Sequence, residues 1–173
     1  MLDLQNQIED FIEAENRDFL FKVGDKTYKP IEKLKLSISY QYLLNDNSEF
    51  SFKNIEFSKK ASQFIKNKTD YQIYFEKISE ICNLEYSFFK EETKKFIIIS
   101  SPNKELKAQA CNILKIKPNE LDRIPQLFIE IKLYTNKNNN RAPRIFGFIG
   151  HLNILHILFY DPFHKIYSKT SPK

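Results

Sequence analysis

Four residues near the C-terminal end of this sequence have the side chains that metal-free cleavage of RNA requires: Arg144, Asp161, His164 and Tyr167. A histidine exchanges a proton near neutral pH, and a neighbouring carboxylate can fix its tautomer. An arginine can bind a phosphate and stabilise the charge that develops when a 2′-hydroxyl attacks a phosphodiester. We therefore treat these four as candidate catalytic residues. The competing interpretation is an ordinary turn, in which the Asp161 carboxylate accepts a backbone N–H and His164 bonds back to the chain.

A basic segment lies beside these residues. No Asp or Glu occurs between residues 131 and 160, and two of the four arginines in the chain fall in one short loop there. The guanidinium fork suits phosphate, so the candidate nucleic-acid-binding residues are Lys132, Lys137, Arg141 and Arg144. Nearby aromatic residues that could stack on a base are Tyr134, Phe146 and Phe148.

The charge is unevenly distributed along the chain. Residues 1–86 have a net charge of −3 and residues 87–173 a net charge of +8. A basic half favours a polyanionic partner such as RNA, DNA or an acidic protein. Lysine alone is weak support, because an Asn- and Ile-rich chain from an AT-rich genome is also lysine-rich. The acidic N-terminal segment favours a second interpretation, a non-catalytic binding subunit of a larger complex.

A second, separate candidate is His156 with Gly147. If the last hairpin has a turn of two or four residues, Gly147 lies opposite His156 and leaves open space beside the imidazole. Such a space would suit a small molecule. The alternative is a half-buried structural histidine, which is the more common situation.

Several kinds of site are excluded or disfavoured. The chain has three glycines (Gly24, Gly147 and Gly150), too few and too scattered for a phosphate-cradling loop or a dinucleotide fingerprint. A nucleophile elbow of the G-x-S-x-G type is absent. His151 and His156 are five residues apart, which matches no zinc spacing. We expect no metal and no cofactor.

The compartment expected from the sequence is the cytoplasm. The N-terminal residues are acidic and amphipathic, unlike a signal or transit peptide. The most apolar run, residues 145–160, is shorter than the roughly 20 residues of a spanning helix, and we interpret it as a buried hairpin without membrane contact. Cys82 and Cys111 are isolated and are expected to be reduced and buried.

Hydrophobic periodicity predicts the elements that position these residues. Helices are expected over 3–15, 58–66, 70–82 and 103–114, with a short one opening at Pro118. Strands are expected over 34–44, 49–57, 96–100, 126–134, 144–149 and 153–160, besides a hairpin over 19–29 that turns at Gly24. The predicted class is α+β, with antiparallel sheets and helices packed on one face. The charged segment 90–95 suggests two parts, 1–90 and 91–173, with one continuous domain as the alternative.

The second part resembles the RelE/ParE-like toxins of bacterial toxin–antitoxin modules. The resemblance covers residues 95–168: a strand, two helices and a three-strand meander, with the segment RAPRIF and the ending HKIY. It implies a small cytoplasmic toxin that cleaves mRNA on the ribosome or poisons gyrase, with Arg144, His164 and Tyr167 as the functional set and an antitoxin as partner. Together with the candidate catalytic residues and the basic segment, this predicts a bacterial toxin or defence-associated protein that acts on RNA as a metal-independent endoribonuclease. The alternative is a non-catalytic nucleic-acid- or protein-binding subunit of a larger defence complex.

Overall fold

The computed structural model describes residues 21–23, 26–28, 36–59, 67–83, 96–121, 127–135, 141–150 and 154–167. Two compact units divide the chain, Met1–Leu34 and Lys35–Lys173. In the first unit, strands β1 (Phe21–Val23) and β2 (Lys26–Tyr28) form an antiparallel hairpin. This confirms the hairpin expected there, whereas its turn residue Gly24 and the helix expected over 3–15 lie outside the described residues.

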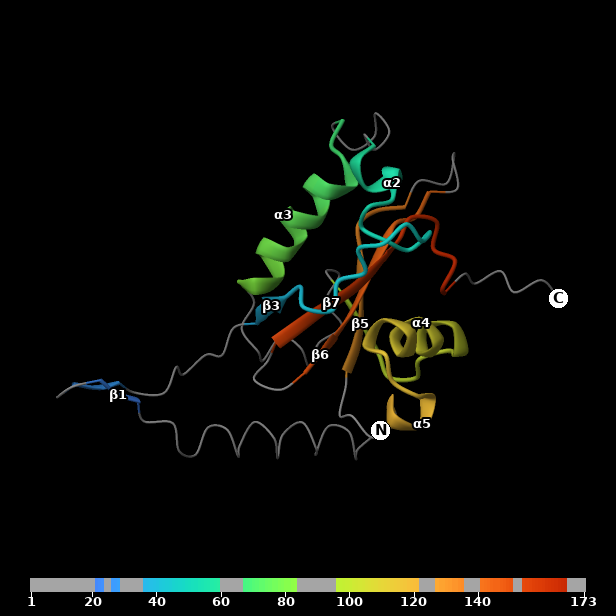
Figure 1. Ribbon diagram of the computed structural model, residues 1–173. Helices are drawn as coiled ribbons and strands as arrows, with labels where there is room; N and C mark the ends of the chain where they lie inside the picture. Colours follow the sequence, from blue (N-terminus) through green and yellow to red (C-terminus); the bar gives the residue numbers. More distant parts are fainter. Residues whose placement is uncertain are drawn as a thin grey trace. The chain divides into compact units, whose positions relative to one another are not determined.

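The second unit is built on a five-stranded sheet in the order β3-β7-β6-β5-β4 (Figure 1). Its strands are β3 (Ser37–Ser39), β4 (Ile97–Ile99), β5 (Leu127–Lys132), β6 (Arg144–Ile149) and β7 (Ile154–Asp161). Strands β4 to β7 pair antiparallel, and β3 pairs parallel to β7. The α+β class is confirmed, but the sheet is mixed rather than purely antiparallel.

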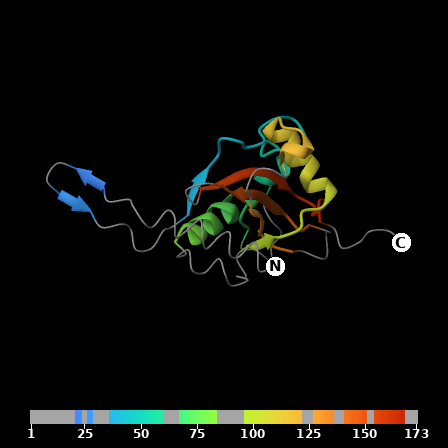
Figure 2. The same cartoon turned by 90° about the horizontal axis from the view of Figure 1, so that it is seen from below.

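The helices of this unit cover both faces of the sheet, which corrects the expectation that they pack on one face. They are α2 (Ile55–Ser58), α3 (Asp70–Cys82), α4 (Lys104–Leu114) and α5 (Pro118–Leu121). One core cluster joins α3 to the sheet through Ile73, Ile78, Ile129, Ile145 and Leu155. The other joins α4 to the opposite face through Leu106, Ala110, Phe128, Phe146 and Leu158. Figure 2 shows α3 and α4 on opposite sides of the strands. The central strands are therefore apolar on both faces, as expected for a covered sheet.

The two long helices begin at polar caps. Thr69 and Gln72 form a capping box at the start of α3, and the Asn103 side chain accepts the backbone N–H of Leu106 at the start of α4. Helix α4 ends at Lys115, which has a left-handed backbone with φ of 56°. Because both caps are built from residues adjacent in sequence, these helix starts were predictable to within a residue or two.

The segment between β3 and α3 departs most from the sequence prediction. The strand expected over 34–44 ends at Ser39, because the chain turns at residues 40–43 and rejoins β7 through a hydrogen bond from Leu44 N to Leu158 O (2.7 Å). The strand expected over 49–57 is absent from this described segment. Instead Asn54 accepts the backbone N–H of Glu56 and starts α2. Residues 60–66 of the helix expected over 58–66 lie outside the described part of the chain.

The domain organisation also differs from the expected boundary near residue 90. Strand β3 and helix α3 precede that boundary but share one sheet and one core with the C-terminal strands. Cys82 is half-buried and Cys111 is buried, and both are free thiols. In the described residues, no helix has the length and apolar character needed to cross a membrane.

Candidate functional site

Two polar clusters lie at one end of the sheet, on opposite faces. At this end β5 and β7 finish and β6 begins, so that Lys132 pairs with Arg144 and Arg144 pairs with Asp161. We call the first group the Asp70 cluster; it consists of Glu56, Asp70, Tyr134, Arg141 and Tyr160. We call the second the His164 cluster; it consists of Glu130, Arg144, Asp161 and His164. The two arginines of the basic loop therefore belong to different sites.

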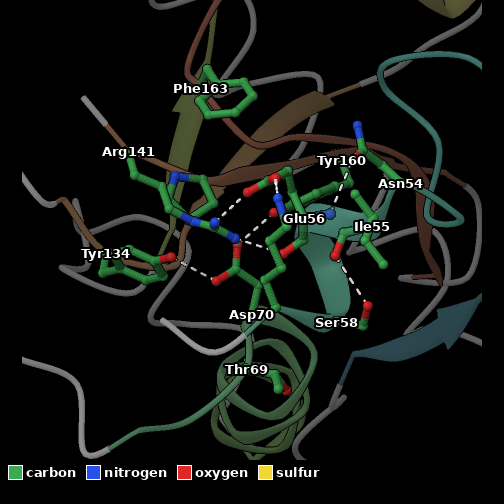
Figure 3. Close-up of polar contacts among 12 residues, drawn as sticks. Asn54, Ile55, Glu56, Ser58, Thr69, Asp70, Tyr134, Arg141, Tyr160 and Phe163 are labelled. Carbon is green, nitrogen blue, oxygen red and sulfur yellow. Dashed lines mark hydrogen bonds and ion pairs between the residues drawn. The ribbon is translucent and has the colours of Figure 1, made fainter. Parts of the chain in front are cut away.

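The Asp70 cluster lies on the face that α3 covers (Figure 3). Asp70 is the first residue of α3 and is fully buried. Its two carboxylate oxygens accept hydrogen bonds from Tyr134 Oη (2.7 Å), Arg141 Nη2 (3.0 Å) and Tyr160 Oη. Arg141 also pairs with the Glu56 carboxylate and donates to the Glu56 backbone oxygen (2.6 Å). The network ties α2, α3 and the basic loop to the ends of β5 and β7.

The electrostatics of the Asp70 cluster fit a structural role. Burial, with the neighbouring Asp70 carboxylate, raises the pKa of both Tyr134 and Tyr160 above the usual value for tyrosine. The Asp70 hydrogen bonds raise the pKa of Arg141 despite its burial. These groups keep one protonation state throughout the physiological range, so the cluster offers a fixed ion pair rather than an acid or a base.

The His164 cluster lies on the opposite face, which α4 covers. Arg144 Nε is 2.7 Å from Glu130 Oε1, and its Nη1 donates to the backbone oxygens of Tyr134 (2.9 Å) and Pro143 (3.0 Å). Both Arg144 and Glu130 are buried. Burial lowers the pKa of the Arg144 guanidinium, and the Glu130 carboxylate opposes that shift. Arg144 therefore holds Glu130 in place and does not present its guanidinium to solvent.

Asp161 and Tyr167 fix the backbone around His164. The Asp161 carboxylate is fully buried and accepts the backbone N–H groups of Phe163 (3.2 Å) and Ile166 (2.9 Å). This is the turn that the competing interpretation predicted for Asp161. Tyr167 Oη accepts the backbone N–H of Asn103 (2.9 Å) and donates to Ser101 O (3.1 Å), so it anchors the start of α4. Both side chains are occupied by bonds within the fold.

His164 is the member of the cluster with substantial exposure, 24% for its side chain. Its backbone is left-handed, with φ of 55°, a conformation that non-glycine residues adopt rarely and that often marks functional positions. Its Nε2 atom lies 4.0 Å from Glu130 Oε1. Burial, with the nearby Arg144 guanidinium, lowers the pKa of His164, so the imidazole is neutral at pH 7. A neutral imidazole beside a fixed carboxylate can accept a proton.

The candidate nucleic-acid-binding residues differ in exposure and in their contacts. Lys132 is exposed at the end of β5, and Lys137 lies outside the described residues. Arg141 and Arg144 both have intramolecular carboxylate partners. The expectation that Tyr134, Phe146 and Phe148 stack on a base is wrong, because all three are buried in the two cores. Among the described residues, Lys132 and Lys165 are exposed basic side chains at this end.

The space expected between Gly147 and His156 does not exist. Gly147 pairs with Ile157, and a β-carbon on Gly147 would lie 2.5 Å from the backbone oxygen of His156. The imidazole instead stacks on Phe148, with ring centroids 4.8 Å apart, and lies against Gly150. Burial lowers the pKa of His156. This residue is a half-buried structural histidine at the other end of β7, remote in the strand register from the His164 cluster.

Near His164, the sequence analysis missed Glu130 and Phe163. Glu130 is the one acid in the apolar run of β5, and an isolated charge in a buried strand predicts a charged partner nearby. That signal was available. Phe163 is 41% exposed beside His164, and nothing in the sequence distinguishes it from the buried aromatic residues.

Comparisons with protein-family models, with curated proteins and with solved structures found no match to this chain. Within the described ranges, no three His, Cys, Asp or Glu residues are grouped closely enough to hold a metal ion. The functional argument therefore depends on the geometry of the two clusters.

Proposed function

We propose that this protein acts on RNA as a metal-independent endoribonuclease, with His164 as the group that moves the proton. The observation that carries the proposal is the position of His164: a partly exposed, neutral imidazole on left-handed backbone, 4.0 Å from a carboxylate that Arg144 holds. Catalytic hydrogen bonds are often longer without substrate than with it, so this distance suits a pair that tightens on binding.

In the proposed reaction, His164 accepts the proton of a ribose 2′-hydroxyl. The 2′ oxygen forms a bond to the adjacent phosphorus, and the bond from phosphorus to the 5′ oxygen breaks. His164 returns its proton to the departing 5′ oxygen, giving a 2′,3′-cyclic phosphate and a 5′-hydroxyl. Glu130 orients the imidazole, and the exposed Lys132 ammonium stabilises the charged phosphorane. Arg144 and Asp161 are positioning residues here, and Tyr167 supports the adjoining helix.

The test is cleavage of a short labelled RNA by the purified chain in the presence of EDTA. Asparagine tolerates left-handed backbone, so His164→Asn preserves the turn while it removes the proton acceptor. We expect this variant to lose at least about a hundredfold in rate, within the range of general acid–base catalysis. The matched control is His156→Gln, which changes a histidine outside the site. Equal cleavage by His164→Asn and wild type, or no cleavage by any of the proteins, contradicts the proposal.

A second candidate is a non-catalytic RNA-binding or protein-binding subunit of a larger defence complex. It is favoured by the internal hydrogen bonds of Arg144, Asp161 and Tyr167. Of the four candidate catalytic residues, these bonds leave His164 to transfer a proton. RNA that binds at this end of the sheet but stays intact supports it. In the cell, we propose a cytoplasmic toxin or defence-associated protein that an antitoxin or a larger complex restrains.

A further inference from the structure

The turn that carries His164 also presents an aromatic ring. Pro162 and Ile166 are buried on either side of it, and the Asp161 carboxylate accepts two of its backbone N–H groups. Phe163, His164 and Lys165 are the members of this turn that reach solvent. Because the backbone is held at both ends, the Phe163 ring is displayed on a fixed support.

The chemistry around the Phe163 ring suits a nucleotide. Phe163 adjoins His164, and Lys165 Nζ lies 5.9 Å from its ring centroid. Lys132 is exposed at the same end of the sheet, where it pairs in the strand register with Arg144, which in turn pairs with Asp161 at the start of this turn. Lys165 pairs with Glu49 at the surface, so Lys132 is the stronger candidate for a phosphate. An exposed aromatic ring near positively charged side chains is the combination that binds a base and its phosphate together.

We propose that Phe163 is a stacking platform for one unpaired base beside the phosphate that His164 attacks, so that the substrate is single-stranded RNA. This inference rests on the proposed action on RNA and adds the form of the substrate. A base in a duplex has both faces covered by its neighbours, whereas an unpaired base can place one face against an exposed ring. Because every base has a face that can stack, stacking does not depend on which base is present. We therefore expect the protein to prefer single strands over duplexes, without preferring a particular sequence.

The test is the affinity of the full chain for a short single-stranded RNA and for a duplex of the same sequence, measured by fluorescence anisotropy. RNA with a 2′-O-methyl group prevents cleavage during the measurement. The variants are Phe163→Ala, Phe163→Leu and Phe163→Tyr. Leucine keeps an apolar side chain without a ring, and tyrosine restores the ring. The matched control is Phe75→Ala, which removes an aromatic side chain of similar exposure from α3.

We expect the Ala and Leu variants to bind the single strand about tenfold more weakly, and the Tyr variant to bind it like wild type. The slope of affinity against salt should stay the same, because no phosphate contact is removed. Wild-type affinity for the duplex should be lower and insensitive to position 163. The inference is overturned if Phe163→Leu binds the single strand as tightly as wild type does. It is also overturned if the wild-type protein binds duplex and single strand equally well.

Failure of this inference is distinguishable from failure of the proposed function. If His164→Asn abolishes cleavage while Phe163→Leu binds RNA normally, the nuclease proposal stands and the stacking platform is wrong. If binding depends on Phe163 but no RNA is cut, the platform stands and catalysis is wrong. Absence of any RNA binding contradicts both.

Discussion

At the scale of single residues, Asp70 gives the sharpest energetic prediction. Its buried carboxylate compensates the Arg141 guanidinium and accepts two tyrosine hydroxyls. Asp70→Asn keeps the side-chain size but removes the charge and turns part of the acceptor into a donor. Because a buried ion pair loses more when one partner is removed than the pair itself contributes, we expect a loss of about 3 kcal/mol in the free energy of unfolding.

Urea denaturation measures this loss. The matched control is Glu76→Gln, which removes a carboxylate that pairs with Lys68 at the surface of the same helix. That change should cost under about 0.5 kcal/mol, since exposed ion pairs contribute little. A loss for Asp70→Asn as small as that of the control would contradict the structural role of the buried ion pair in the Asp70 cluster.

The sequence placed some of these residues correctly but not their burial. Arg144 and Asp161, which the sequence analysis grouped as candidate catalytic residues, do form a cross-strand pair. The Asp70 cluster could not be foreseen, because it joins a helix start to the ends of two strands 64 and 90 residues away. From the sequence alone, Arg141 and Arg144 cannot be distinguished from arginines that bind phosphate. Their carboxylate partners come from opposite faces of the sheet.

At the scale of elements, the pairing of β6 with β7 depends on Gly147. The register shifts between Phe146 and Gly147, and residue 158 has no partner of its own in the pairing. A β-carbon at Gly147 meets a backbone oxygen at 2.5 Å, whereas one at Gly150 meets the end of the His156 imidazole at 3.2 Å. We expect Gly147→Ala to destabilise by about 2 kcal/mol and Gly150→Ala by less than about 1, because a ring can move and a paired strand cannot.

Urea unfolding of the two alanine variants measures this difference directly. Gly150→Ala is the matched control, since it lies on the same hairpin and faces the same histidine. Equal losses for the two variants contradict the close approach of β6 to β7.

This shift in register also explains why the faces of the last strand were predicted only in part. Strict alternation along a strand places Leu155, Ile157 and Phe159 on one face. In the structure Leu155 and Ile157 pack on the α3 side, and Phe159 packs on the α4 side. A β-bulge that inserts one residue reverses the alternation of the side chains after it. When both faces of the strand are apolar, the sequence pattern does not reveal where such a bulge lies. The same double burial explains why helices on both faces were not foreseen.

At the scale of the whole molecule, the division at residue 34 predicts that the second unit folds alone. The described members of both core clusters are residues from Leu36 onward, and the five described strands of this sheet all belong to the second unit. Residues 35–173 should therefore unfold in one cooperative transition, followed by far-UV circular dichroism in urea. The midpoint should match that of the main transition of the full chain, because every described core residue is retained. Asp70→Asn in the shortened chain supplies the check: its cluster lies wholly within this unit, so the loss should again be about 3 kcal/mol, as distant changes are additive. A shortened chain that unfolds without cooperativity, or that is indifferent to Asp70→Asn, shows instead that the core and its buried ion pair need the first unit to form.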